Sequence, residues 1–246
     1  MTRDPGDFWD YLRSATPARI ALGRAGDGLP THRVLEFELA HARARDAVWA
    51  ELDGAALLAE LAAWHPLLVR SAAPDRAIFL QRPDLGRRLA QPSLHALLPG
   101  SYDATIIIAD GLSASAMQGQ AAPLCKMLLA APDFVFAPPV IALQARVALG
   151  DEIAARQNAA LAVVLIGERP GLSACDSMGA YITFDPKPGV TRDANRNCVS
   201  NIRGQGLSLS EASRRILAIM GLARTIRQSG TGLKEDDALD ALPPLP

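Results

Sequence analysis

The hydrophobic pattern divides the chain into a mainly helical first part and a second part in which strands and helices alternate. Over residues 6–65, charged and apolar residues are interleaved at helical spacing, which predicts helices. Two short apolar runs follow these helices, Leu67–Ser71 and Ala77–Gln81, and they predict a strand pair. We therefore expect residues 1–100 to form a mainly helical N-terminal region with a short strand pair.

Beyond residue 100 the apolar runs become short and are separated by amphipathic segments. Strands are predicted at 105–109, 161–166, 180–184 and 198–202, further extended structure at 138–143 and around Val147, and helices at 113–131, 151–160 and 210–228. Such alternation favours a Rossmann-like α/β fold, with a mostly parallel sheet flanked by helices and joined by right-handed crossovers. We expect this domain to span residues 101–233.

Composition narrows the partners that the chain can bind. Its 25 basic and 26 acidic residues nearly cancel, and no basic patch is visible, which argues against a nucleic-acid surface. No run approaches the roughly 20 apolar residues of a membrane span, and the first residues lack the apolar core of a signal peptide. We expect a cytoplasmic protein that binds neither nucleic acid nor membranes, with a disordered acidic tail at 234–246.

The predicted strand at 161–166 ends in the loop Gly167–Gly171, which carries Glu168 and Arg169. In open α/β sheets, ligands bind beyond the carboxyl ends of the strands. Pro170 and the final glycine restrict the chain just after the two charges, which should hold both in place. A salt-bridged surface loop is the alternative interpretation, but the position at the end of a buried strand favours a ligand contact.

Two other segments are candidates for a polar site. Asp110–Ser113 follows a predicted strand, and it is either a site at a helix N-terminus or an ordinary turn in which Ser113 caps the helix. Cys198 alone would be read as a small buried residue, but the segment 196–203 around it is rich in amide, hydroxyl and guanidinium groups. This density of polar groups favours a site near Cys198.

No self-sufficient catalytic or metal site is apparent. The segment Gly23–Gly28 lacks the order of a dinucleotide fingerprint and follows no convincing strand. The histidines show no metal-ligand spacing, and the cysteines form no C-x-x-C pair, which predicts reduced thiols and no zinc site. The residues concerned are His32, His41, His65, His95, Cys125, Cys175 and Cys198. The absence of such sites suggests that the chain works with a partner.

Six motifs, in order over about residues 10–233, resemble the small subunit of ethanolamine ammonia-lyase. They are TPARIALGRAG (16–26), RPDLGRR (82–88), IADGLS (108–113), ARVALGDEI (145–153), LIGERPGL (165–172) and RNCVSNIR (196–203). The family is a lyase that depends on adenosylcobalamin and converts ethanolamine to acetaldehyde and ammonia by a radical mechanism. The resemblance implies a hetero-oligomer that is located in the cytoplasm, either free or inside a bacterial microcompartment.

The resemblance also implies a division of labour. A large TIM-barrel subunit would hold the substrate and the adenosyl group, while this chain would cover the cobalamin and be inactive alone. The family's cobalamin positions carry over onto Val147, Glu168 and Cys198, and no catalytic or metal-ligating residue is expected. Because the D-x-H-x-x-G motif of some mutases is absent, no histidine should bind cobalt. The alternatives are a stand-alone nucleotide-binding Rossmann-like enzyme and a non-catalytic scaffold whose helical N-terminal half docks a partner.

Overall fold

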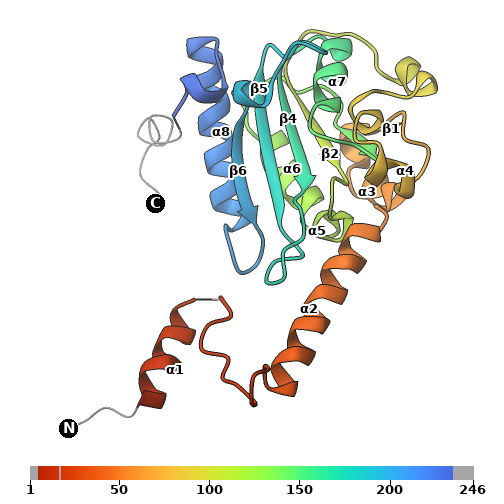
Figure 1. Ribbon diagram of the computed structural model, residues 1–246. Coiled ribbons are helices and arrows are strands. Elements are labelled where there is room, and N and C mark those ends of the chain that lie inside the picture. The colour runs from red at the N-terminus through yellow and green to blue at the C-terminus, as the bar shows by residue number, and fades with distance from the viewer. Residues whose placement is uncertain (1–4, 17, 235–246) are drawn as a thin grey trace.

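A six-stranded sheet forms the centre of the computed structural model, which describes residues 5–16 and 18–234 (Figure 1). Its strands lie in the order β1-β3-β2-β4-β5-β6. The bounds are β1 Leu67–Arg70, β2 Tyr102–Ala109, β3 Val140–Leu143, β4 Ala159–Gly167, β5 Met178–Phe184 and β6 Asn197–Ile202. Apart from Lys234, the expected disordered tail lies outside the described residues.

The first four strands in this order run parallel, and β5 is antiparallel to both of its neighbours. The loop between β4 and β5 contains no helix, so the chain turns back beside β4 instead of crossing over the sheet. In the resulting register Tyr181 of β5 lies between Val164 of β4 and Cys198 of β6. The expected α/β fold with a mostly parallel sheet is confirmed.

Helices cover the two faces of the sheet unequally. Their bounds are α1 Pro5–Ala15, α2 Thr31–Trp49, α3 Gly54–Glu60, α4 Arg76–Gln81, α5 Ala114–Met117, α6 Ala121–Leu129, α7 Leu149–Gln157 and α8 Leu209–Ile226. Helices α5, α6 and α8 pack on one face around residues such as Ile106 and Leu165. Helix α7 packs on the other face around Ile107 and Val164. Because α7 lies mainly over β4 and β2, no helix of the described residues crosses the same face of β5 and β6 (Figure 1).

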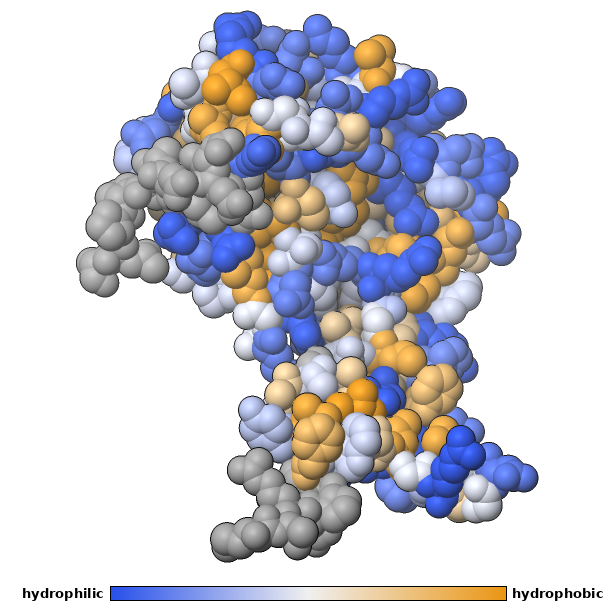
Figure 2. Space-filling view, turned by 60° about the vertical axis from the view of Figure 1, so that its left-hand side comes forward, coloured by the Kyte–Doolittle hydropathy of each residue, from blue (hydrophilic) through white to orange (hydrophobic). Residues whose placement is uncertain are grey.

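The helical arm, which we define as residues 5–16 and 18–49, extends away from this body (Figure 1). In α2 only Ala47, near the end that joins the body, is buried. Apolar side chains along the arm are exposed, among them Leu35 (58%), Phe37 (46%) and Leu39 (52%). The lower part of Figure 2 shows apolar surface mixed with polar surface over the arm. The arm therefore offers apolar surface that the chain itself does not cover.

Three local expectations from the sequence were wrong. The expected second strand of the N-terminal pair is helix α4, capped by Asp75, whose carboxylate accepts from the backbone N–H of Ile78 (2.8 Å). Its buried residues Arg76 and Phe79 lie three apart on one helical face. The expected first strand is β1, which pairs with β3 in the main sheet.

The other two errors concern helix boundaries. Val147 lies in a turn, not in extended structure, because its carbonyl accepts from Gly150 N (3.0 Å) as α7 begins. The single helix expected at 113–131 is divided into α5 and α6. Between them Gly119 has φ +76°, a left-handed conformation that interrupts a right-handed helix.

Candidate functional site

Asp110 anchors the loop that leads to Val147. Its side chain is fully buried, and its carboxylate accepts from the backbone N–H groups of Gln144 and Ala145 at 2.8 Å each. Arg76 Nη1 lies 3.4 Å from the same carboxylate. Burial raises the pKa of Asp110, while these hydrogen bonds and the guanidinium act in the opposite direction. Asp110 is thus held inside the protein, away from any ligand.

The Asp110–Ser113 segment is a capped turn. Ser113 Oγ accepts from Ala116 N (3.3 Å) at the start of α5 and donates to the carbonyl of Cys175 (2.7 Å). A Cβ on Gly167 would lie 2.1 Å from the carbonyl oxygen of Ser113, so only glycine permits this approach. Of the two interpretations left open by the sequence, the turn is confirmed, and β4 packs directly against it.

Glu168 follows this glycine, and its carboxylate accepts hydrogen bonds from residues just before β5 and in β6. Ser177 Oγ donates to its Oε2 (2.5 Å), and Asn201 N donates to its Oε1 (3.4 Å). A Cβ on Gly179 would be 3.0 Å from Oε1, so the absence of a side chain at Gly179 leaves room for the carboxylate. Gly179 and Tyr181 are two residues apart in β5, so they lie on the same face of the strand. The carboxylate of Glu168 therefore lies on the face that carries Tyr181.

Tyr181 is the centre of the residues that the sequence analysis selected. Tyr181 pairs in register with Cys198, which is exposed on β6. Tyr181 and Val147 both pack against the apolar core beneath α7. Burial raises the pKa of Tyr181 to about 12, and Cys198 and Glu168 add to this effect. Glu168 and Cys198, from two separate motifs, therefore lie close enough to Tyr181 to affect its ionisation, and Val147, from a third, packs against the same apolar core as Tyr181. We call this surface of β5 and β6 the open face.

A cavity of about 570 Å³, which we call the Tyr181 cavity, adjoins the open face. Its apolar lining residues are Leu80, Pro83, Val147 and Ala148. The polar lining residues are Arg87, Arg146, Arg169, Tyr181, Thr191, Arg192, Asp193 and Arg196. Apolar surface beside many hydrogen-bond donors suits a ligand that carries both apolar and acceptor groups.

A buried ion pair lies beside this cavity. Arg196 donates to both carboxylate oxygens of Asp151 (2.7 Å each) and to Thr183 Oγ1 (3.0 Å). Asp151 belongs to α7 and Thr183 to β5, so this arginine joins the start of β6 to two other elements. Sequence analysis had selected this motif for Cys198 and the loop 167–171 for Glu168 and Arg169, while Arg196, Tyr181 and the remaining arginines of the cavity were missed. The sequence signal that could have identified Tyr181 was its position in a strand, on the same face as Gly179 and Thr183.

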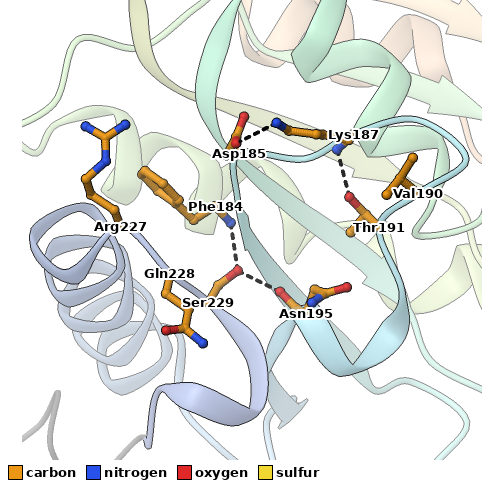
Figure 3. A pocket seen from close by; sticks show the side chains of 9 residues that line it. All are labelled: Phe184, Asp185, Lys187, Val190, Thr191, Asn195, Arg227, Gln228 and Ser229. Carbon is orange, nitrogen blue, oxygen red and sulfur yellow. Dashed lines mark hydrogen bonds and ion pairs between the residues drawn. The ribbon is translucent and has the colours of Figure 1, made fainter.

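A second hollow, of about 270 Å³, contains mutually paired polar groups (Figure 3). Ser229 Oγ accepts from Phe184 N (2.8 Å) and donates to the carbonyl of Asn195 (2.6 Å). Lys187 Nζ lies 3.1 Å from a carboxylate oxygen of Asp185. The contacts of Ser229 join the segment after α8 to β5, and we regard the hollow as a structural junction.

The described part of the chain contains no cluster of three or more histidine, cysteine or acidic side chains arranged to hold a metal ion. Within the same residues, none of the helices has both the length and the apolar character needed to cross a membrane. The open face and the Tyr181 cavity therefore remain the strongest candidate site.

Comparison with known proteins agrees with the motifs. The sequence profile of the ethanolamine ammonia-lyase light chain (EutC) matches residues 6–234. The ethanolamine ammonia-lyase small subunit of Pseudomonas fluorescens (strain Pf0-1) is 47% identical over 250 residues, which cover 97% of this chain and 91% of the relative. The small subunit of Ralstonia nicotianae is 48% identical over 246 residues, with 96% and 90% covered. The chain therefore belongs to the ethanolamine ammonia-lyase light-chain family.

Proposed function

We propose that this chain, as the small subunit of ethanolamine ammonia-lyase, binds adenosylcobalamin on its open face and covers it against a large TIM-barrel subunit. The observation that carries the proposal is that Glu168 and Cys198 lie beside Tyr181, and Val147 lines the same cavity, on a sheet face that no helix of the described residues crosses. The complex converts ethanolamine to acetaldehyde and ammonia, and we expect it in the cytoplasm, free or within a microcompartment.

The chemistry of the open face fits a corrinoid. Corrin presents an apolar ring with amide side chains, and its nucleotide loop adds a phosphodiester, a ribose and a base. Val147 and Tyr181 supply apolar and aromatic surface, and Glu168 is positioned to accept hydrogen bonds from amide N–H or hydroxyl groups. Exposed Cys198 supplies a compact, polarizable contact. Apolar surface beside hydrogen-bonding groups would suit the corrin ring and its amide side chains.

The chain's residues would bind and orient the cofactor and would not replace its ligands. All four histidines fall within residues 32–95, and none lines the Tyr181 cavity. When bound, adenosylcobalamin supplies radical chemistry by homolysis of its cobalt–carbon bond. On this proposal the small subunit excludes water from one side of the cofactor, and the large subunit supplies the groups that contact substrate.

The experiment that tests the proposal measures cofactor binding by the assembled two-subunit complex. Glu168→Ala removes the carboxylate on the open face and is expected to weaken adenosylcobalamin binding about tenfold, because a hydrogen bond to a charged group is worth about 1.5–3 kcal/mol. Subunit association should be unchanged. Equilibrium titration followed by the cobalamin absorption spectrum measures the first quantity, and co-purification measures the second.

Two controls separate a direct contact from a change in local structure. Ser177→Ala removes the hydroxyl that donates to Glu168 but leaves the carboxylate in place, so it should weaken binding less than Glu168→Ala does. Glu60→Ala changes an exposed acid on α3 and should have no effect on binding. Unchanged cofactor affinity in Glu168→Ala would contradict the assignment of Glu168. Absence of cobalamin binding by the wild-type complex would contradict the proposed function itself.

A further inference from the structure

Positive charge exceeds negative charge around the Tyr181 cavity, although Asp151 pairs with one of its arginines. Within the described part of the chain, five arginines line the cavity, and Asp193 is the one acid among the lining residues. Asp193 is fully exposed to solvent, which screens its charge. The chain as a whole has a net charge of −1, so this concentration of guanidinium groups is a local feature of the cavity.

Arg146 is held at the cavity with hydrogen-bonding capacity unused. Its guanidinium lies over the ring of Phe79 at 4.3 Å, and its backbone N–H donates to the carbonyl of Gly86 (2.8 Å). Its Nε is buried and has no hydrogen-bond partner within the part of the chain that the structure describes. Burial lowers the pKa of Arg146, and the nearby cations Arg76 and Arg87 lower it further. A buried donor beside other cations favours the approach of an anion.

Arg196 presents a second unused donor. Its side chain is 3% exposed, and Asp151 and Thr183 engage its Nη1 and Nη2 groups. Among the described residues its buried Nε has no hydrogen-bond partner, and a carboxylate oxygen of Asp193 lies 3.8 Å from it. The ion pair with Asp151 fixes the guanidinium in place, so this donor is oriented before any ligand arrives.

We propose that the arginines of the Tyr181 cavity bind a phosphate ester, and that its source is the phosphodiester in the nucleotide loop of cobalamin. This inference rests on the proposed function and adds a binding site for one group of the cofactor. Arginine suits the site because its planar guanidinium donates two parallel hydrogen bonds to phosphate oxygens. The two unpartnered Nε groups would gain an acceptor that the folded chain lacks.

The experiment isolates the phosphate by comparing two corrinoids on the assembled two-subunit complex. Adenosylcobinamide lacks the nucleotide loop, and adenosylcobinamide phosphate differs from it by the phosphate. We expect the phosphate-bearing compound to bind the wild-type complex about tenfold more tightly, because hydrogen bonds between ions are the strong ones. Arg146→Gln should abolish this difference, and Arg146→Lys should restore part of it.

Arg82→Gln is the matched control, because Arg82 is exposed and pairs with Asp84 outside the cavity. It should preserve the difference between the two corrinoids. Equal affinity of the wild-type complex for both compounds, including no detectable binding of either, would overturn the inference. If adenosylcobalamin still binds in that case, the proposed function stands and the phosphate site alone fails. Saturable binding of inorganic phosphate without any corrinoid difference would identify free phosphate as the occupant and would equally overturn the assignment.

Discussion

At the scale of single residues, Asp110 is the side chain on which the loop before Val147 depends. Asp110→Ala would leave two buried backbone N–H groups and the guanidinium of Arg76 without their acceptor. Removing one partner of a buried ion pair costs about 3–5 kcal/mol, and we expect a fall of that size in the free energy of unfolding. Chemical denaturation of the variant and the wild type measures it.

A matched variant tests whether burial is the reason. Asp84→Ala breaks the exposed pair between Asp84 and Arg82, and the free energy of unfolding should not change, because surface ion pairs contribute little. Equal stability of Asp110→Ala and the wild type would show that the buried anchor is unimportant for folding.

The ionisation of the Tyr181 phenol on the open face can be followed by titration with pH. Its pKa is raised to about 12, whereas an unfolded chain would ionise it near 10. Because the folded state keeps the proton more tightly, this contribution to stability is fully present below about pH 10 and is lost as the pH rises through about 12. In an absorbance titration of tyrosinate, Tyr181→Phe should remove the transition near pH 12.

The neighbours of Tyr181 provide the check on that assignment. Cys198→Ser should move the transition to lower pH, because Cys198 contributes to the raised pKa. Tyr11→Phe, on the helical arm, should retain it. Persistence of the highest transition in Tyr181→Phe would mean that another tyrosine is responsible.

The residues of the site were predictable from sequence to different degrees. Glu168 could be placed because a long apolar run ends immediately before it, and Val147 and Cys198 came from motifs of a known family. Tyr181 and the cavity arginines other than Arg169 were missed, because their importance arises from register and burial. Tyr181 becomes central only when β5 turns back antiparallel beside β4 and aligns it with Cys198. No local pattern in the sequence specifies that alignment.

At the scale of elements, long periodic segments were predicted better than short ones. Strands β2, β4, β5 and β6 and helix α8 lie where their apolar patterns placed them. Helix α4 was read as a strand because six residues are too few to distinguish the two periods, and its capping residue Asp75 was not recognised. Strand β1 was expected to pair locally, although its partner β3 lies about 70 residues further along the chain.

The start of α8 gives a test at this scale. Ser208 caps the helix by accepting from Glu211 N (3.2 Å), and α8 packs against β5 and β6 behind the open face. Ser208→Ala should lower the free energy of unfolding by about 0.5–2 kcal/mol, the usual cost of losing an N-cap. Chemical denaturation measures the change. Ser210→Ala, at an exposed position of the same turn, should have almost no effect, and equal losses in the two variants would argue against the cap.

At the scale of the whole molecule, the helical arm is the feature that the chain alone does not explain. Several of its apolar side chains are exposed, and exposed apolar surface of this kind marks sites of protein association. A small subunit needs a surface for its large subunit, and we infer that the arm provides part of it. The open face and the arm would then bring cofactor and partner to the same chain.

Leu35→Glu tests this inference directly. Leu35 is 58% exposed on α2, so a charge there should leave the free energy of unfolding of the isolated chain unchanged. In a complex, the same charge would be buried without a partner, and we expect at least tenfold weaker association with the large subunit. Leu98→Glu is the control, because Leu98 is 73% exposed on the body, outside the arm. Co-purification and titration of the two subunits measure the effect. If Leu35→Glu associates as tightly as the wild type while the control behaves normally, the interface lies elsewhere on the chain.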